Sequence, residues 1–283
     1  MAQSRWVAGE LIAKHDSLDV DLVVVRTTGD RVQDVALHEV GGKGLFTREV
    51  EEALLRHEAD LAVHSLKDLP SDVPEGLAVA AYTVSEDPRD VLISRAGLRL
   101  DGLPEGARVG TSSLRRIAQL GAYRPGLGFA PIRGNIDTRL RKLEAEGWDG
   151  IVLAGAGLTR LGLAGKITEW LPTTVCLPAA GQGILAVQVR EDDAETRRIA
   201  GCVDCRESRI RAEAERSAME RLGGGCRTPM GFLAKIDGDT CRLEGFVVPQ
   251  DGGAIVRTAA EGNVEQPAEL GVRLAEALLA LGA

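Results

Sequence analysis

The sequence lacks a long apolar run and an excess of positive charge. No apolar run reaches the roughly 18 residues that a membrane-spanning helix needs, and the residues that follow Met1 do not have the pattern of a signal peptide. The formal net charge is −8, whereas proteins that bind nucleic acids generally neutralise phosphates with a basic face. We therefore expect neither a membrane nor a nucleic acid as a partner.

The sequence also lacks a paired set of cysteines and a cluster of metal ligands. Its five cysteines are an odd number, and their spacing does not match the disulfide framework of a secreted domain. Cys202 and Cys205 form a single C-x-x-C pair, but no second pair or neighbouring histidine completes a zinc site. We expect a reducing compartment, the cytoplasm, and no bound metal.

The chain of 283 residues is long enough for two or three domains. Up to about residue 200, short apolar runs alternate with amphipathic stretches, a pattern typical of βαβ units and mainly parallel sheets. In such sheets, ligands bind where strands end and helices begin. The predicted strands are 20–25, 60–64, 77–84, 107–110, 127–132 and 150–154, and the predicted helices are 44–57, 112–120, 135–145 and one that begins near 157.

The last part of the chain has a different pattern. A charged amphipathic helix at 207–222 is followed by three strand-like stretches and a further helix, which predicts an antiparallel α+β unit. Two segments, 85–90 and 178–183, are predicted to cross between lobes. The predicted domains are a first α/β lobe (1–85 and 184–204), a second α/β lobe (86–183) and a C-terminal α+β domain (205–283), whose strands are 232–236, 241–248 and 254–259 and whose last helix is 268–281.

Cys226 lies in an unusual setting, directly after the glycines 223–225 and before Arg227. Glycines strip away bulk and free the backbone, so a large group can approach the sulfur. An adjacent arginine favours the thiolate, which is the nucleophilic form. The alternative interpretation is a small buried hydrophobe after a flexible turn. Cys226 is therefore a candidate anchor for a covalently bound group.

Basic residues gather where predicted strands meet predicted helices. Arg115 and Arg116 follow a glycine and three hydroxyl residues in the first turn of a helix, where an exposed cation costs about 0.3–1 kcal/mol against the helix dipole. Arg133 and Arg139 flank a second turn of the same kind. Arginine forks bind carboxylates with two hydrogen bonds. The two turns therefore predict a ligand with several carboxylates.

Two further segments carry charge at the end of a strand or the start of a helix. Lys67 and Asp68 follow the strand at 60–64, and a carboxylate in such a place can hold a cation or pass protons; a surface ion pair is the alternative. Lys43 lies in a glycine-rich turn before a predicted helix, where an anion can bind. Its spacing does not match a nucleotide-binding phosphate loop, and a plain flexible loop is the alternative.

Eight motifs together resemble the porphobilinogen deaminase family, whose members are also called hydroxymethylbilane synthases. The motifs follow one another in the family's order over nearly the whole chain: VGGKGLF, AVHSLKDLP, EDPRD, VGTSSLRR, RGNIDTRL, LAGAGLTRLGL, LPAAGQG and GGGCRTPMG. The resemblance implies two lobes similar to type II periplasmic binding proteins and a third α+β domain. It also implies a monomeric transferase of haem biosynthesis that joins four porphobilinogen molecules head to tail, with loss of ammonia, to give hydroxymethylbilane.

The resemblance implies roles for individual residues. Cys226 would hold a dipyrromethane cofactor through a thioether. Asp68 would be the catalytic residue, which contacts pyrrole N–H groups, assists the loss of ammonia and stabilises the resulting azafulvenium cation. Phe46 would belong to a loop that covers the site. The residues that would bind the carboxylates of cofactor and substrate are Lys67, Ser65, Thr111, Ser113, Arg115, Arg116, Arg133 and Arg139, with Lys43 and Arg160 as weaker matches.

One departure from the family pattern stands at the amino terminus. Family members begin with a strand that ends in an Arg-x-Ser-Pro-Leu-Ala turn, whereas residues 1–6 resemble the helix after that turn. Without that strand, we expect reduced stability and little activity. The main alternative function is a non-catalytic anion-binding homologue that uses the same two lobes. A DNA-binding regulator is disfavoured because the sequence has no amino-terminal helix-turn-helix and the wrong charge.

Overall fold

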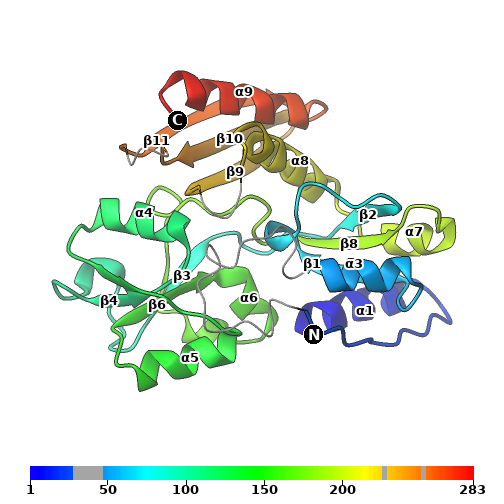
Figure 1. Ribbon diagram of the computed structural model, residues 1–283, viewed down its shortest axis with the longest axis horizontal. Helices are drawn as coiled ribbons and strands as arrows, with labels where there is room; N and C mark the ends of the chain where they lie inside the picture. The colour runs from blue at the N-terminus through cyan, green and yellow to red at the C-terminus, as the bar shows by residue number, and fades with distance from the viewer. Residues whose placement is uncertain (28–46, 225–227, 250–252) are drawn as a thin grey trace.

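The computed structural model describes residues 1–27, 47–224, 228–249 and 253–283. Their strands form three separate sheets. Figure 1 shows two α/β lobes side by side, with a third unit of sheet and helices lying across them. The predicted fold class, two α/β lobes with an α+β third domain, is confirmed. Each sheet lies within one of the three predicted domains, whose boundaries stay a prediction.

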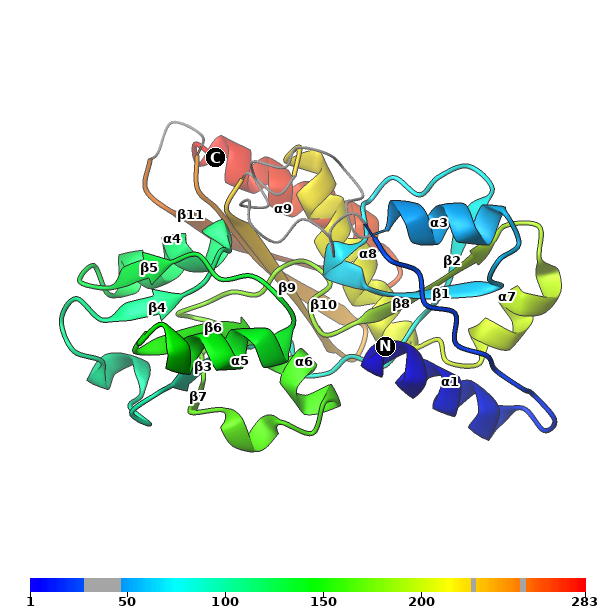
Figure 2. The same ribbon diagram turned by 60° about the horizontal axis from the view of Figure 1, so that its bottom comes forward.

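The first lobe contains a three-stranded sheet in the order β1-β8-β2, with both pairs antiparallel. Helix α1 packs its buried Val7 and Leu11, one turn apart, against the buried strand β8. Figure 2 shows α1, α3 and α7 around this sheet. The elements are α1 (Ala2–Lys14), α3 (Arg48–Leu55), β1 (Leu61–Ser65), the 3₁₀ turn η1 (Leu66–Asp68), β2 (Leu77–Tyr82), β8 (Leu185–Arg190) and α7 (Ala194–Gly201).

The second lobe contains a five-stranded sheet in the order β5-β4-β6-β3-β7. Strand β4 runs parallel to β5 and β6, whereas β3 runs antiparallel to β6 and β7. Two clusters of buried apolar side chains form the core of this lobe. The elements are β3 (Asp90–Ser94), η2 (Leu100–Gly102), β4 (Arg108–Gly110), α4 (Leu114–Tyr123), β5 (Gly128–Ala130), α5 (Ile136–Ala145), β6 (Gly150–Ala154), α6 (Gly155–Arg160), η3 (Ala164–Lys166) and β7 (Glu169–Trp170).

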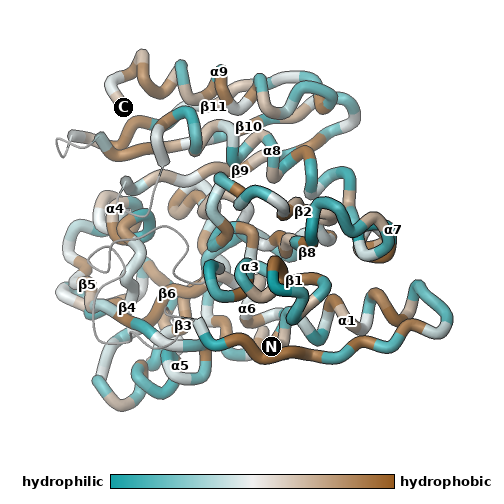
Figure 3. Tube along the Cα trace, turned by 45° about the vertical axis from the view of Figure 1, so that its right-hand side comes forward, coloured by the Kyte–Doolittle hydropathy of each residue, from teal (hydrophilic) through white to brown (hydrophobic). Residues whose placement is uncertain are grey.

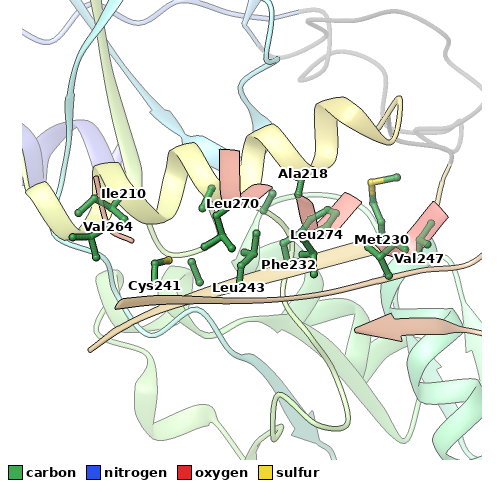
Figure 4. Packing of buried hydrophobic residues seen from close by; sticks show 14 residues of the cluster. Ile210, Ala218, Met230, Phe232, Cys241, Leu243, Val247, Val264, Leu270 and Leu274 are labelled. Atoms are coloured by element: carbon green, nitrogen blue, oxygen red, sulfur yellow. The ribbon is translucent and has the colours of Figure 1, made fainter. Parts of the chain in front are cut away.

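The third domain packs two helices on an antiparallel sheet in the order β11-β10-β9. Figure 4 shows Ile210 and Ala218 of α8 and Leu270 and Leu274 of α9 in one apolar cluster with side chains of the sheet. Helix α9 alternates apolar and polar residues along its length in Figure 3, as a helix with one buried face should. The elements are α8 (Arg206–Arg221), β9 (Met230–Asp237), β10 (Thr240–Val247), β11 (Val256–Asn263) and α9 (Pro267–Ala280).

Two sequence predictions about strands were wrong. Residues 20–25, which are apolar except for Asp21, form no strand in the described part of the chain, and Val23 and Val24 are 55% and 66% exposed. The sheets are also not mainly parallel, because β1 and β2 pair antiparallel with β8, and β3 pairs antiparallel with its neighbours. Strands β3 and β8 follow the two segments that cross between the lobes. Each strand enters its sheet from the other lobe and therefore runs antiparallel to the strands beside it.

Glu215 of α8 ties the third domain to the segment that precedes β8. Its side chain is 1% exposed, and its two carboxylate oxygens accept hydrogen bonds from the backbone N–H groups of Gly181, at 2.7 Å, and Ala234, at 2.9 Å. Burial raises the pKa of Glu215. A buried acceptor that satisfies two buried N–H groups at once stabilises this junction.

Replacing Glu215 by glutamine is expected to lower the free energy of unfolding by about 1–3 kcal/mol. A glutamine has one acceptor atom, so its NH₂ group would face a backbone N–H that then lacks a partner. Urea unfolding followed by circular dichroism measures the difference. The matched control is Glu213→Gln, because Glu213 is an exposed residue of the same helix. Equal stability of the two variants would contradict the prediction.

Candidate active site

The 3₁₀ turn η1 sets Lys67 and Asp68 at the end of strand β1. Leu66 is buried and its N–H donates to Ile184 O at 3.0 Å, whereas Lys67 and Asp68 are exposed. Pro70 follows within two residues and prevents the turn from continuing as a helix. The local sequence thus buries the apolar residue and leaves Lys67 and Asp68 as exposed residues beside it.

Arg216 of the third domain holds this turn from outside the first lobe. Its guanidinium donates to Leu69 O at 2.9 Å, to Pro70 O at 2.7 Å and to Leu66 O at 3.4 Å. Arg216 is partly buried, and that burial lowers its pKa. The planar guanidinium of Arg216 therefore binds carbonyl groups before and after Asp68 in the chain, and these contacts restrict where the carboxylate can lie. The position of Asp68 therefore depends on the third domain as well as on its own strand.

Arg115 and Arg116, in the first turn of α4, both bind Asp90 at the start of β3. Arg115 Nη1 lies 2.7 Å from Asp90 Oδ2, and Arg116 Nη2 lies 2.7 Å from Asp90 Oδ1. Arg115 also donates to Leu177 O, and Arg116 to Val152 O. The sequence predicts an anion beside these two cations at the start of a helix. In the structure that anion is Asp90, a residue of the protein itself. Binding of a ligand carboxylate by Arg115 and Arg116 stays a prediction.

Asp90 is fully buried, and its ionisation is controlled by these arginines. Burial alone would raise its pKa, but the charges and hydrogen bonds of Arg115 and Arg116 outweigh burial and hold the pKa well below its usual range. The thiol of Cys176 also lies 3.3 Å from Asp90 Oδ2. Asp90 therefore stays charged and keeps both guanidinium groups in place.

Arg139 and Arg133 belong to the second strand-to-helix turn, between β5 and α5. Arg139 Nε donates to Gly134 O at 2.7 Å, and both arginines are half-buried. Burial lowers the pKa of Arg139, as do the charges of Arg116 and Arg133, whereas Asp68 raises it. Arg139 thus lies within electrostatic range of Asp68, which comes from the other lobe. Cations from two turns and the exposed carboxylate converge on one region.

The predicted hydroxyl residues lie at the edges of this region. Ser65 Oγ accepts from Gln3 Nε2 of α1 at 2.8 Å. Thr111 is buried, and its Oγ1 accepts from the N–H of Ser113 at 3.3 Å. Ser113 is the N-cap residue of α4, and its side chain makes no capping hydrogen bond. The hydroxyl of Ser113 is not used to cap its own helix.

Arg160, at the end of α6, contacts the segment at 178–183 that crosses back to the first lobe. Its Nη2 donates to Gly183 O at 2.5 Å, while its Nε and that of Arg116 are buried without a hydrogen-bond partner. Burial lowers the pKa of Arg160, and the charge of Glu86 raises it. Buried guanidinium N–H groups without an acceptor are costly unless a bound anion supplies one. The described site therefore has hydrogen-bonding capacity that the protein itself does not use.

Three predicted residues, Lys43, Phe46 and Cys226, lie outside the described residues. Sequence reasoning missed three others: Asp90, Gln182 and Arg216. Asp90 and Gln182 lie inside the motifs EDPRD and LPAAGQG, which were interpreted as crossings between lobes and not as ligands of the arginines. Arg216 lies on a helix with many charged residues, and no local signal distinguishes it.

One pocket of the described residues lies away from the predicted site residues. A pocket of about 400 Å³ is lined by Leu55, His57, Gly76 and residues 190–192, and it contains none of the predicted site residues. Across the described ranges, no group of three or more His, Cys, Asp or Glu side chains is placed to hold a metal ion. None of the described helices is long and apolar enough to cross a membrane.

Comparison with known proteins identifies the family. The family model of the porphobilinogen deaminase dipyromethane cofactor binding domain matches residues 1–198, and that of the porphobilinogen deaminase C-terminal domain matches residues 209–280. The porphobilinogen deaminase of Pelotomaculum thermopropionicum is 52% identical over 283 residues, which are 100% of this chain and 91% of the relative. That of Desulforudis audaxviator is 48% identical, over 100% of this chain and 92% of the relative.

Among solved structures, the periplasmic VFT2 domain of BvgS from Bordetella pertussis matches with a TM-score of 0.39 at 14% identity, over 71% of this chain and 76% of that chain. The match to the cofactor-binding domain confirms the prediction of dipyrromethane as the cofactor. The family models cover most of the chain, and the relatives are similar along its whole length. The chain therefore belongs to the porphobilinogen deaminase family of transferases.

Proposed function

We propose that this chain joins four porphobilinogen molecules head to tail on a dipyrromethane held by Cys226 and releases ammonia at each step to give hydroxymethylbilane. The observation that carries the proposal is the exposed carboxylate of Asp68 within electrostatic range of Lys67 and Arg139. We further propose that the chain acts as a monomer in the cytoplasm. We also propose domain boundaries at residues 85, 183 and 204.

The described residues fit a ligand that carries several carboxylates. Each porphobilinogen ring has an acetate and a propionate, and the buried Nε atoms of Arg116 and Arg160 lack acceptors. The dipyrromethane, when bound, supplies the nucleophilic pyrrole carbon at which the product chain grows. The residues that would hold the carboxylates are Ser65, Lys67, Thr111, Ser113, Arg115, Arg116, Arg133 and Arg139, together with Lys43.

Asp68 would stabilise the positive charge that the reaction creates. When the carbon–nitrogen bond of the substrate's aminomethyl group breaks, the nitrogen leaves as ammonia and the remaining pyrrole is a cation. A carboxylate held close to that cation lowers its energy, and the η1 turn with its Arg216 contacts holds Asp68 in position.

The alternative of a non-catalytic anion-binding protein is less consistent with this arrangement. A binder of polycarboxylates gains from cations but loses affinity from an exposed carboxylate among them, because like charges repel. A cation that forms at the site gives the carboxylate of Asp68 a direct role in the reaction. The electrostatics of the described residues therefore favour catalysis over binding alone.

Incubation of the purified chain with porphobilinogen tests the proposal. We expect four molecules of ammonia for each hydroxymethylbilane, measured by an ammonia assay and by the absorbance of the porphyrin that forms after ring closure and oxidation. Binding of porphobilinogen without release of ammonia would support the anion-binding alternative and contradict the proposed function.

A further inference from the structure

Gln182 lies in the segment that crosses from the second lobe back to the first, between two glycines that the fold requires. Gly181 and Gly183 have φ values of +72° and +99°. A Cβ at residue 181 would lie 2.6 Å from Leu66 Cγ, and one at residue 183 would lie 2.5 Å from Glu86 O. Side chains at these positions would push the segment away from both lobes. The glycines thus allow Gln182 to lie between the lobes.

The side chain of Gln182 contacts one charged group from each lobe. Its Oε1 accepts from Lys67 Nζ at 3.3 Å, while its Nε2 donates to Asp90 Oδ1 at 2.9 Å and to Pro88 O at 2.6 Å. The amide orientation is determined by its partners, because an ammonium only donates and a carboxylate and a carbonyl only accept. Gln182 is 1% exposed, so water cannot easily replace these contacts.

We propose that Gln182 is a positioning residue that couples the Lys67–Asp68 pair of the first lobe to the Asp90–arginine cluster of the second lobe. Its amide oxygen accepts from the ammonium of Lys67, and its NH₂ group is one of the donors around Asp90, with Arg115, Arg116 and Cys176. The importance of this coupling for turnover rests on the proposed function. The coupling itself does not, because it is a property of the free protein.

Lys67 is sensitive to the loss of an acceptor because its charged end is surrounded by protein, although the residue as a whole is exposed. Burial lowers the pKa of Lys67 to about 8; Asp68 and Asp90 raise it, and Arg116 and Arg115 lower it. An amide oxygen stabilises the ammonium form without adding charge. Without that oxygen, the two arginines and burial would dominate, and Lys67 would lose its proton closer to neutral pH.

Gln182→Met tests this inference, with Gln188→Met as the matched control. Gln188 is 0% exposed and bonds to His64 and Glu51 inside the first lobe, so both variants remove a buried amide of equal size. Lys67 titration is followed by NMR after reductive ¹³C-methylation of the six lysines. The Lys67→Arg variant assigns the Lys67 signal.

We expect the pKa of Lys67 to fall by about one unit in Gln182→Met, which corresponds to the loss of one hydrogen bond to a charged group. The basic limb of the pH profile of kcat/KM should move to lower pH by the same amount, since Lys67 is charged only below its pKa. A purely structural effect would scale activity equally at every pH. Gln188→Met should change neither the pKa of Lys67 nor the basic limb of the pH profile of kcat/KM.

A second variant keeps the test decisive if Gln182→Met folds poorly. Gln182→Asn retains an amide but is one methylene too short to reach Lys67 and Asp90 together, and it should shift the Lys67 pKa in the same direction. An unchanged pKa in both variants, or an equal shift in Gln188→Met, would overturn the inference. Absence of turnover in the unaltered chain would contradict the proposed function and leave the Lys67 titration as an independent result.

Discussion

Replacing Cys226 by serine is expected to remove a covalent mass excess from the protein and to abolish turnover of porphobilinogen. Intact-protein mass spectrometry of the unaltered chain should show an excess that matches a dipyrromethane, and the Cys226→Ser variant should show none. A thioether forms from a thiolate, and a serine hydroxyl does not ionise at neutral pH, so the variant cannot hold the group. In the sequence, Arg227 and the three glycines predict a thiolate that a large group can reach.

Other cysteines of the chain provide the control for this prediction. Burial raises the pKa of Cys176 to about 12 and also raises the pKa of Cys241, so both are poor nucleophiles. Cys205 is only partly buried and occupies the N-cap position of helix α8, where serine is favoured. Cys205→Ser should therefore keep the adduct. An adduct that persists in Cys226→Ser, or its absence from the unaltered chain, would contradict the assignment of Cys226.

Replacing Asp68 by asparagine is expected to lower kcat by about a hundred- to a thousandfold while the fold and the covalent adduct remain. Asparagine has the shape of aspartate but lacks the charge that stabilises a cation. The backbone carbonyls that Arg216 holds are unchanged by this substitution, so the η1 turn should keep its place. Steady-state turnover, circular dichroism and intact mass measure the three properties separately.

The matched control for this variant is Asp192→Asn. Asp192 is an exposed carboxylate that lines the pocket beside Leu55 and Arg190, away from the predicted site residues. It should keep its activity within about twofold, as is usual for surface substitutions. If Asp68→Asn retains turnover at the level of Asp192→Asn, Asp68 has no catalytic role.

Elements with a local signal were predicted well from the sequence. Strand β6 lies at the predicted residues 150–154, and α5 begins directly after Asn135, whose side chain accepts from Thr138 N at 2.9 Å. Helices α8 and α9 begin and end within one residue of their predicted bounds. Capping and hydrophobic periodicity depend on neighbours only a few residues away, so the sequence displays them directly.

Two strands that depend on distant partners were missed, and one segment was predicted as a strand that does not form. Strands β3 and β8 were not predicted as strands, although each is fully buried in its sheet. Residues 20–25 have the composition of a strand but no strand assignment. A strand forms only where another segment supplies hydrogen bonds, and β8 obtains them from β1 and β2. Composition alone does not reveal which segments meet.

The family of this protein was readable from the sequence, because eight motifs stand in the order of the porphobilinogen deaminase family. The motifs contain the thiol of Cys226, the carboxylate of Asp68 and the arginine-bearing turns, whose roles stay predictions. Only the tertiary structure decided which charges face one another. Asp90 forms ion pairs with Arg115 and Arg116, and Gln182 joins that cluster to Lys67. These contacts arise where the chain crosses between lobes, so their geometry is set by long-range packing, which no local pattern encodes.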